Sequence, residues 1–480
     1  TLALADCVHL FAIYFQERNK GETSKESMIK SLELNLQPLF LTTVTTCIGF
    51  LSFNALDVEP LRDLGNGISL GVLFAFIYTI FFIAPLISFL DVKIPTSTQQ
   101  QVNLSRKLAI FSLSSGKTFL WTIPLICSLL ILLIPLNKLE MNPTQMYSEK
   151  YTSFGPDVLW LDKKLGASFP ISFKATSDNG SVSNPRFLEG LDNFSIWLEE
   201  QKEVTHVTSL ARTMKSLNKS MHGDDLKMKV IPEDQELSSQ YLFFYEMSLP
   251  MGLDLNTSIS QDRGSTRIAA TLREMTSKEY LIFDEKVAEY LRENNLESII
   301  SKPAGFRVIF VYLMEAIVNS LLVGVTIGLA LIITVIGFFF RSASFGFLSS
   351  FPNILPIVSA FGIWAIIDGQ IDFMVAVGMG STLGIIVDFT VHLLSKYDLA
   401  RQELKKSPED AVLFAFEAVG FALIAMTIIL ALGFSVLHLV SFLPMHNFAQ
   451  FSILAFVFAL IIDFFLFPNL LVRFDKRKFD

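Results

Sequence analysis

The chain has 480 residues, of which 51% are apolar and only 18% are charged, so it carries more hydrophobic surface than a soluble domain of this length buries. The formal net charge is −8 without any block of like charge, which excludes the electrostatic footprint of a nucleic-acid-binding protein. All 3 cysteines lie within apolar stretches, so they predict neither a disulfide framework nor a metal cluster. The composition indicates a membrane protein and points to no cofactor.

Membrane-spanning helices are predicted from uncharged windows, because a hydrocarbon core about 30 Å thick requires roughly 20 apolar residues of helix. Eight spans are predicted: residues 34–56, 64–90, 118–137, 316–340, 342–367, 373–395 (interrupted only by Asp388) and two hinged spans that begin within 418–462. Residues 1–15 are apolar except for Asp6 and His9 and predict a ninth span, shorter than a full crossing. Because the chain has no initiator Met and no signal peptide, we expect it to begin within a helix of a longer protein.

The orientation follows from the lysine and arginine residues of the short loops. One side holds nearly all of them, including Lys93, Arg106, Lys396 and Arg401, whereas the short loops of the other side hold only Arg62. The basic side is predicted to be cytoplasmic, which places residues 138–312 outside. Because this segment contains no cysteine, we expect it in a bacterial periplasm and the protein in the bacterial inner membrane.

The chain repeats itself at an offset of 383 to 384 residues, as transporters built from duplicated halves do. The matched pairs are Glu33 and Glu417, Thr43 and Thr427, Gly49-Phe50 and Gly433-Phe434, Pro60 and Pro444, His9 and His392, and Pro85 and Pro468. The first-half partner of the helix at 118–137 is expected about 266 positions before residue 1, which predicts a whole protein of about twelve helices in two halves.

The spans and the repeat together divide the chain into segments. Residues 1–91 hold the last three helices of the first half, 92–117 form a cytoplasmic or interfacial linker, and 118–137 form the first helix of the second half. Residues 138–312 form a periplasmic, porter-like domain, 313–473 hold five membrane helices, and 474–480 are a cytoplasmic tail. The predicted fold class is a polytopic α-helical membrane protein with nine spans and one α+β domain outside the cytoplasm.

The outside segment alternates strand and helix patterns. Residues 169–173 and 268–272 alternate apolar and polar side chains, which predicts two half-buried strands. Residues 187–198 and 280–291 keep helical spacing, whereas the polar stretch 219–235 has no period and is predicted to be a loop. These elements predict a small α+β sandwich of ferredoxin-like units. The segment shows no nucleotide-binding loop, nucleophile elbow or paired-histidine helix, so no enzyme is predicted.

Two pairs of ionisable residues lie at membrane depth, where a charge costs about 2.5 kcal/mol or more and is therefore a candidate functional group. Asp388 and His392 are four residues apart, and Asp6 and His9 are three apart, so each pair shares one face of its helix. If the two repeated helices pack at the centre of the bundle, the pairs face each other and form a proton relay. The alternative is that the four groups only satisfy one another and hold the helices together.

Supporting residues are predicted near this relay: a glycine that permits close approach of another helix, and three threonines that offer hydroxyl groups. They are Gly384, Thr390, Thr43 and Thr427. Asp463 lies near the inner end of its helix and is predicted to be an interfacial residue rather than a proton carrier.

Several motifs carry a family resemblance. The second half contains GIIVDFTVH in its fourth helix, followed by T-x(5)-G-F and P-x(23–24)-P patterns, and the outside segment contains LDKKLGASFPISFKA and VTHVTSLARTMKSLN. With six-helix halves and a large outside domain, these motifs resemble the resistance-nodulation-division superfamily, in particular its MMPL-type branch, which is related to Patched and Dispatched. The resemblance implies a proton-motive-force-driven exporter of lipids or other hydrophobic molecules, with Asp388 and Asp6 at the family's transmembrane acidic positions. Some members carry adjacent acidic pairs where this chain has one Asp per helix, which leaves the proton stoichiometry open.

Three functional hypotheses follow. The leading one is a secondary transporter in which proton transit through Asp388, His392, Asp6 and His9 drives export of an amphipathic substrate. The second is a non-transporting membrane protein that senses lipid or sterol or serves as a scaffold. The third and weakest is an intramembrane enzyme, because each Asp/His pair resembles a two-ligand metal site without a third ligand. The expected partners are membrane lipids, a hydrophobic or lipid substrate and protons, with a homo-oligomer or a periplasmic accessory protein left open.

Overall fold

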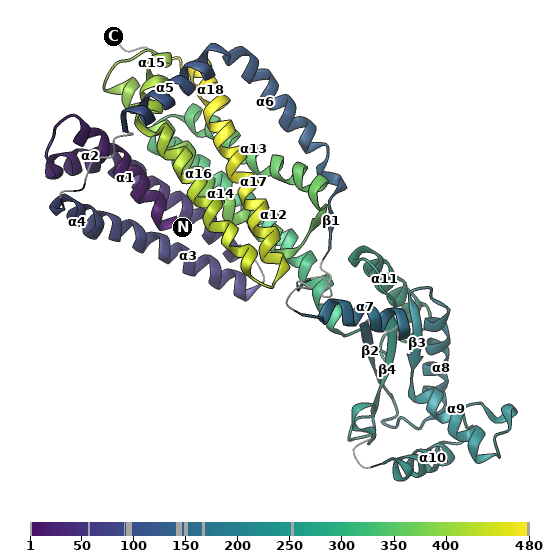
Figure 1. The fold of residues 1–480 in the computed structure, drawn as a ribbon. Helices are drawn as coiled ribbons and strands as arrows, with labels where there is room; N and C mark the ends of the chain where they lie inside the picture. Colours follow the sequence, from purple (N-terminus) through teal and green to yellow (C-terminus); the bar gives the residue numbers. More distant parts are fainter. Residues whose placement is uncertain are drawn as a thin grey trace. The chain divides into compact units, whose positions relative to one another are not determined.

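The computed structural model describes residues 2–55, 58–90, 92, 98–140, 146–147, 152–165, 169–250 and 254–477. The chain divides into two compact units, one made of Thr1–Leu139 with Glu315–Asp480 and the other of Glu140–Met314. The first unit is almost entirely helical, whereas the second combines helices with a small sheet (Figure 1). The uncharged windows of the sequence all fall in the first unit.

The helices of the first unit follow one another with short connections. They are α1 (Leu2–Asn19), α2 (Ser24–Leu51), α3 (Glu59–Tyr78), α4 (Ala84–Phe89), α5 (Thr98–Ser114), α6 (Gly116–Ile131), most of α12 (Phe306–Phe339), α13 (Ala343–Ile367), α14 (Phe373–Gln402), α15 (Pro408–Ala415), α16 (Phe421–Ser435), α17 (Leu443–Phe465) and α18 (Phe467–Phe474). Shorter turns are the 3-10 segments η1 (Ser52–Ala55), η3 (Ile134–Leu136) and η8 (Val436–Leu439) and the π-helices η2 (Thr79–Ile83) and η7 (Phe416–Gly420). A short parallel pairing joins β1 (Lys138–Leu139) to β5 (Gln370–Ile371).

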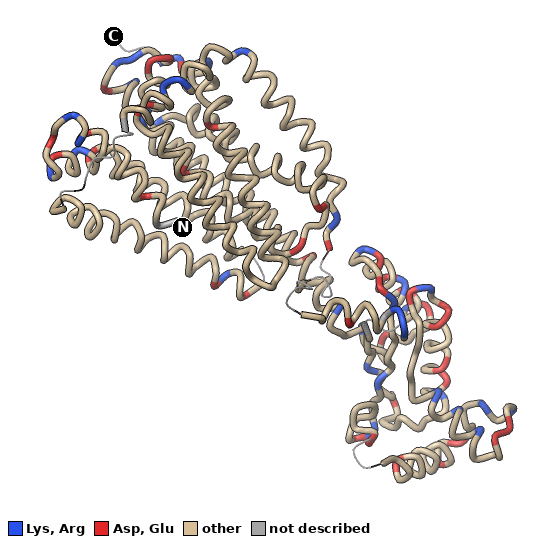
Figure 2. The backbone as a smooth tube through the Cα atoms, viewed as in Figure 1, with Lys and Arg blue, Asp and Glu red and all other residues tan. Residues whose placement is uncertain are grey.

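Eight helical stretches within the described residues are long and apolar enough to cross a membrane, which makes this a multi-pass membrane protein. They are Ser24–Ala55, Glu59–Phe89, Gly116–Leu136, Phe306–Phe339, Ala343–Ile367, Phe373–Gln402, Pro408–Leu439 and Leu443–Phe474. The predicted count of nine is not confirmed: α1 is a helix, but it is short and carries Asp6, Glu17 and Arg18. Figure 2 shows lysine, arginine, aspartate and glutamate gathered mainly at the ends of these helices.

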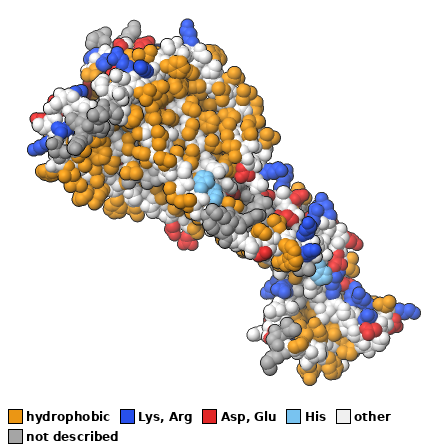
Figure 3. Space-filling view, viewed as in Figure 1, with side chains coloured by type: hydrophobic (Ala, Val, Ile, Leu, Met, Phe, Trp, Pro, Cys, Tyr) orange, Lys and Arg blue, Asp and Glu red, His pale blue; other side chains and the backbone are white. Residues whose placement is uncertain are grey.

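The helical unit is hydrophobic on its outside and densely packed around α14. Figure 3 shows hydrophobic side chains over most of the visible face of this unit, as expected of a surface that contacts lipid. Large apolar residues such as Phe74, Phe81 and Trp121 are exposed there. By contrast, α14 is buried along most of its length and packs against α2, α13, α15 and α17. The polar residues of α14 are therefore shielded from lipid.

The second unit is built on a three-stranded antiparallel sheet in the order β2-β4-β3. Its strands are β2 (Phe169–Thr176), β3 (Val204–Thr208) and β4 (Ser265–Leu272). Its helices are α7 (Phe154–Leu165), α8 (Pro185–Glu200), α9 (Leu210–Met221), α10 (Gln235–Ser248) and α11 (Ser277–Glu293), with 3-10 turns η5 (Leu226–Met228) and η6 (Leu255–Thr257). Isolated antiparallel bridges from Ile300 and Ala304 continue the sheet beyond β2.

The core of this unit lies between the sheet and two helices. Ile171, Phe173 and Ile268 from the strands are fully buried together with Phe194 of α8 and Phe283 of α11. The rings of Phe173 and Phe194 meet edge to face at 5.2 Å between centroids. The two strands and two helices predicted from periodicity are thus present as β2, β4, α8 and α11, whereas the assignment to ferredoxin-like units stays a prediction.

Candidate functional site

The histidines of the two repeated helices lie against each other at the centre of the helical unit. His9 of α1 and His392 of α14 stack with ring centroids 3.5 Å apart and an interplanar angle of 7°. Both side chains are about 1% exposed. Both ring nitrogens of His9 and Nδ1 of His392 have no hydrogen-bond partner among the described residues. Because two stacked imidazolium ions would repel each other strongly in a medium of low dielectric constant, the pair favours at most one positive charge.

The two predicted carboxyl groups accompany this stack. Asp388 and Asp6 are both buried, and Asp6 lies close enough to Asp388 for the two groups to interact electrostatically. Thr46 of α2 shares its one hydroxyl hydrogen between Oδ1 of Asp388, 3.2 Å from Oγ1, and the carbonyl oxygen of Gly384, 2.8 Å from Oγ1. The four residues predicted from the repeat therefore meet in one buried cluster, and α2 supplies a hydroxyl group that the sequence did not single out.

The contact between α2 and α14 depends on two glycines. A Cβ atom on Gly49 would come within 2.7 Å of Cα of Gly384, a distance that no real structure tolerates. The two backbones can approach this closely only because neither residue has a side chain. Gly49 is three residues after Thr46 and Gly384 is four residues before Asp388, so this approach brings the threonine hydroxyl to the carboxyl group.

None of the three predicted supporting threonines is part of the cluster. Thr43 and Thr427 donate their hydroxyl hydrogens to carbonyl oxygens four residues earlier in their own helices, at 2.8 Å to Leu39 and 2.9 Å to Leu423. Their expected hydrogen bonds to the relay are therefore wrong. The hydroxyl that reaches Asp388 belongs to Thr46, almost one helical turn after Thr43.

Asp463 of α17 is not an interfacial residue, contrary to expectation, because its side chain is fully buried. Thr390 of α14 donates a hydrogen bond from Oγ1 to Oδ1 of Asp463 at 3.1 Å and lies 3.4 Å from Oδ1 of Asn353 in α13. Thr390 thus belongs to a second polar cluster, on a different face of α14 from Asp388 and His392. This cluster joins α13, α14 and α17 through three polar side chains.

The charge pattern of the sequence placed Lys396 in a cytoplasmic loop, and the structure corrects this expectation. It lies inside α14 with 1% of its surface exposed. Its Nζ atom donates a hydrogen bond to the carbonyl oxygen of Leu34 in α2 at 2.5 Å. Gly384, Asp388, His392 and Lys396 recur every four residues, so they follow one another along one face of α14.

The C-terminal end of α14 is fixed by the residues that follow α18. Asp475 accepts hydrogen bonds from Tyr397 Oη at 3.0 Å, Arg401 Nε at 3.0 Å and Arg477 Nε at 2.9 Å. Arg477 also pairs with Asp398 at 2.6 Å. Burial alone would raise the pKa of Asp475, but the hydrogen bonds from Arg477 and Arg401 outweigh it and lower the pKa to about 2. Asp475 therefore stays ionised at neutral pH and remains paired with Arg401 and Arg477.

Asp475→Asn is expected to loosen the C-terminal end of α14, because it leaves Arg401 buried without its counter-charge, at a cost of about 3 to 5 kcal/mol. Backbone hydrogen exchange in residues 396–402 at pH 7 measures the effect, with the exposed Glu403→Gln as the control. A carboxyl group with a lowered pKa contributes stability above its ordinary value near 3.8 and loses it as the pH falls toward 2. The difference between wild type and variant should thus be constant from pH 8 to 5 and shrink below pH 4; a difference unchanged at pH 3 would contradict this account.

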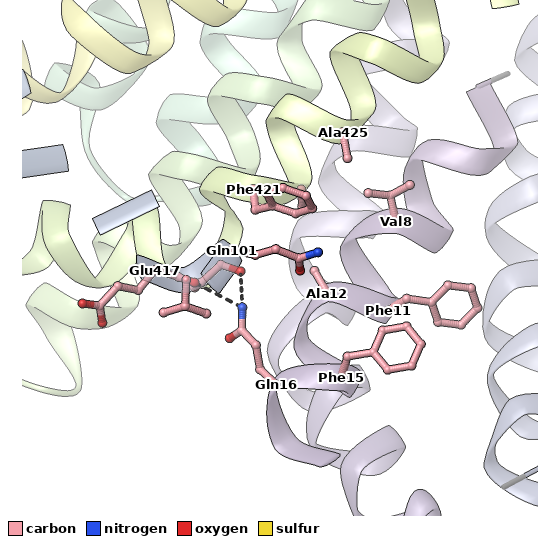
Figure 4. A pocket seen from close by; sticks show the side chains of 12 residues that line it. Val8, Phe11, Ala12, Phe15, Gln16, Gln101, Glu417, Phe421 and Ala425 are labelled. Atoms are coloured by element: carbon pink, nitrogen blue, oxygen red, sulfur yellow. Dashed lines mark hydrogen bonds between the residues drawn. The ribbon is translucent and has the colours of Figure 1, made fainter. Parts of the chain in front are cut away.

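Two cavities lie among the helices of this unit. The first, about 250 Å³, lies between α1, α5, η7 and α16. Figure 4 shows the side chains of Val8, Ala12 and Phe421 at this cavity, with Gln16 at its polar end joined by two dashed hydrogen bonds to backbone carbonyl groups. The second, about 490 Å³, is lined mainly by apolar side chains of α2, η1, α3, α14, η8, α16 and α17. Both cavities are formed by helices of both repeated halves.

No metal centre accompanies these features in the described part of the chain, where no group of three or more His, Cys, Asp or Glu is placed to hold an ion. The arrangement instead offers titratable groups in series across the interface between the halves. Such an arrangement is typical of proton-conducting membrane proteins.

The family follows from a comparison with known sequences. The model of the MMPL family matches residues 185–478, which is more than half of the chain. The chain belongs to the MMPL family. This assignment confirms the resemblance drawn from the motifs around Asp388 and in the outside segment.

The chain is also similar to one curated membrane protein and to solved membrane-protein structures. A membrane protein of Methanocaldococcus jannaschii is 29% identical over 154 residues, which are 32% of this chain and 39% of that protein. The hedgehog release protein Disp from the water bear Hypsibius dujardini aligns with a TM-score of 0.66 and 11% identity, over 98% of this chain and 62% of that one. SecDF, a translocon-associated membrane protein from Thermus thermophilus, aligns with a TM-score of 0.56 and 11% identity, over 99% of this chain and 53% of that one. At these identities the two structures show a shared fold, and the chain spans between about two fifths and three fifths of the length of these relatives.

Proposed function

We propose that this MMPL-family chain is part of a proton-motive-force-driven exporter of a lipid or another amphipathic molecule in a bacterial inner membrane. The observation that carries the proposal is the stack of His9 on His392, which joins the two repeated halves through buried titratable groups. A structural role alone requires no ionisable group at this depth, where each charge is costly. If the two histidines served packing alone, their buried ring nitrogens would be expected to have hydrogen-bond partners, whereas three of them have none among the described residues.

The proposed proton path uses the four predicted residues in series. Asp6 and Asp388 take up protons from the outside, and His9 and His392 pass them between the halves, since each ring accepts a proton on one nitrogen and releases one from the other. Because the two rings stack face to face and their nitrogens bond within the ring planes, a water molecule at the ring edges carries the proton from one ring to the other. Thr46 steadies the carboxyl group of Asp388 by its hydrogen bond. Because the cluster favours different helix positions when it is charged and when it is neutral, proton passage moves the halves relative to each other.

The larger cavity supports a lipid or amphipathic substrate. Its volume of about 490 Å³ is within the range of small-molecule sites, and its walls include Phe50, Phe53, Phe434 and Met445. The helices that line it come from both halves, as do the helices of the histidine stack. A movement between the halves therefore changes the cavity and the stack together, which is the coupling that a secondary transporter needs.

The remaining finer features belong to this proposal. We infer that α1 is the ninth membrane helix, completed in a longer protein, and that the unit Glu140–Met314 lies in the periplasm as a porter-like domain. The order of β2, β4 and β3 with the bridges from Ile300 and Ala304 beyond β2 supports a ferredoxin-like split βαβ arrangement for this unit. No enzymatic activity is part of the proposed function.

A vesicle experiment with the full-length protein tests the proposal. A fluorescent phospholipid serves as the probe, and its movement between leaflets is read by quenching from outside. Movement should follow an imposed pH gradient and stop when an uncoupler removes the gradient. Movement that is equal in protein-free vesicles, or unaffected by the uncoupler, together with tight lipid binding would favour the lipid-sensing or scaffold alternative instead.

A further inference from the structure

The helix that follows the histidine helix in each half has an interruption in its backbone hydrogen bonds at an equivalent place. In α2, Pro38 has no N–H group, so it cannot donate the helical bond to the carbonyl oxygen of Leu34 four residues earlier. In the second half, the π-helix η7 interrupts the run from α15 to α16, and a π-helix displaces carbonyl groups from their usual partners. The offset of 384 residues that relates Glu33 to Glu417 also relates Leu34 to Ala418. A proline in one half and a π-helix in the other thus leave a backbone carbonyl group without its helical partner at equivalent positions.

Each opened carbonyl group is bonded by a long side chain from the histidine helix of the other half. Lys396 of α14 donates to Leu34 in α2, and Gln16 of α1 donates from Nε2 to Ala418 at 3.3 Å and to Glu417 at 3.1 Å (Figure 4). Lys396 follows its histidine by four residues and Gln16 follows its own by seven, so each lies on the histidine face of its helix. Two crossed bonds therefore tie the histidine helices to the opposite halves.

The two bonds differ in charge and burial. Gln16 is neutral and half-buried, whereas Lys396 is an ionisable side chain that is 1% exposed. Among the described residues, no carboxylate forms an ion pair with Lys396. The charge of Lys396 acts electrostatically on both His9 and His392. Packing alone does not require a lysine at this position, because a neutral donor performs the equivalent task in the other half.

We propose that Lys396 is a positioning residue for the histidine stack, anchored on the carbonyl group that Pro38 leaves open, and that Gln16 is its counterpart. The bond between Lys396 and Leu34 sets the height of α14 against α2, and hence the position of His392, one turn away, beside His9. The inference rests on the proposed function, because this position matters only if protons pass through the cluster of Asp6, His9, Asp388 and His392. Proton transfer is sensitive to displacements well below 1 Å, so a small shift of α14 slows it.

The test measures proton flux through the full-length protein in vesicles, in H₂O and in D₂O. Lys396→Met removes the donor, whereas Pro38→Ala gives the carbonyl oxygen of Leu34 a competing backbone N–H partner and so weakens its bond to Lys396 without changing the sequence of α14. Each variant is expected to lower the flux about tenfold and to raise the ratio of the rates in H₂O and D₂O, because proton transfer through the displaced cluster becomes rate-limiting. The double variant should be no slower than Lys396→Met alone, since both changes act on one contact. Lys396→Arg keeps a long cationic donor and should conduct protons at the wild-type rate. Gln16→Leu removes the counterpart bond and should also raise the isotope ratio. The exposed Lys107→Met is the control and should leave both the flux and the isotope ratio at their wild-type values.

The outcomes separate the inference from the proposed function. A wild type that conducts protons, with Pro38→Ala and Lys396→Met at unchanged rate and isotope ratio, overturns the inference and leaves the proposed function standing. Losses that multiply in the double variant also overturn it, because the two residues would then act independently. A wild type without flux overturns both. If Lys396→Met does not fold, Pro38→Ala decides the question alone, because the α14 sequence is intact in that variant.

Discussion

Asp388→Asn is expected to abolish gradient-driven transport by the full-length protein while leaving the amount of folded protein unchanged. Asparagine keeps an oxygen for the hydrogen bond from Thr46 at 3.2 Å and nearly the same volume, but it cannot take up and release a proton. Removal of a group that transfers protons costs about 10² to 10⁴ in rate, so residual transport should be about 1% or less. The lipid-movement assay in vesicles measures it, normalised to the folded protein recovered from detergent.

A matched control separates the loss of the proton carrier from a general effect of the substitution. Asp63 of α3 is exposed, so Asp63→Asn makes the same chemical change away from the cluster and should transport as wild type does. Full transport by Asp388→Asn would mean that the Asp/His pairs only hold the helices together, which is the alternative that the sequence leaves open.

Gly49→Ala is expected to have the second-largest effect, on folding as well as on activity. The added Cβ atom would lie 2.7 Å from Cα and 3.0 Å from N of Gly384, both backbone atoms that have no room to rotate away. The helices α2 and α14 must separate, at a cost of about 1 to 3 kcal/mol for overpacking. Their separation also draws Thr46 away from Asp388. Thermal unfolding in detergent should show a lower midpoint, and flux should fall in the protein that remains folded.

The control for this prediction is the same substitution at a glycine with free space. An added Cβ atom on Gly67 of α3 has no neighbour within 4 Å. Alanine favours the helix over glycine by about 1 kcal/mol, so Gly67→Ala should leave the midpoint unchanged or raise it. Equal midpoints for Gly49→Ala and wild type would show that the close approach of α2 and α14 is not needed.

The membrane helices and the central histidines were accessible to sequence analysis because each leaves a local signal. An uncharged window of about 20 residues predicts a span by itself. The repeat relates His9 to His392, and two repeated helices at the centre of a bundle bring equivalent positions together. No local signal shows whether α1 completes a ninth crossing, since its 18 residues include three charged ones.

The errors inside the bundle have a common physical cause, which is that partners from other helices decide where a polar group lies. Lys396 follows an apolar run and reads as a loop residue, yet the carbonyl group opened by Pro38 allows it to be buried. Asp463 reads as interfacial because it lies near a helix end, yet Thr390 pairs with it in the interior. Thr46 was missed in favour of Thr43 because the repeat marks only the latter. Pro38, which lies inside an uncharged window, was the one sequence feature that indicated a free backbone carbonyl group able to bind the buried Lys396.

In the second unit, periodicity found β2, β4, α8 and α11 but missed β3 and α10, and the amphipathic helix α9 was not predicted either. The strands β2 and β4 alternate cleanly, but the register of β3 shifts between Val204 and His206, which breaks the period of two. The helix α10 exposes apolar side chains such as Phe243 and Phe244, so it lacks a clear apolar face. Both elements depend on tertiary contacts that a periodic pattern does not record.

The most direct test of the central claim is proton flux through the full-length protein, reconstituted in vesicles under an imposed pH gradient, for wild type and for Asp388→Asn. A flux in the wild type that disappears in the variant is the predicted result, because the buried cluster of Asp6, His9, Asp388 and His392 then carries the protons. An equal flux in both proteins, or no flux in a correctly folded wild type supplied with lipid, would contradict the account.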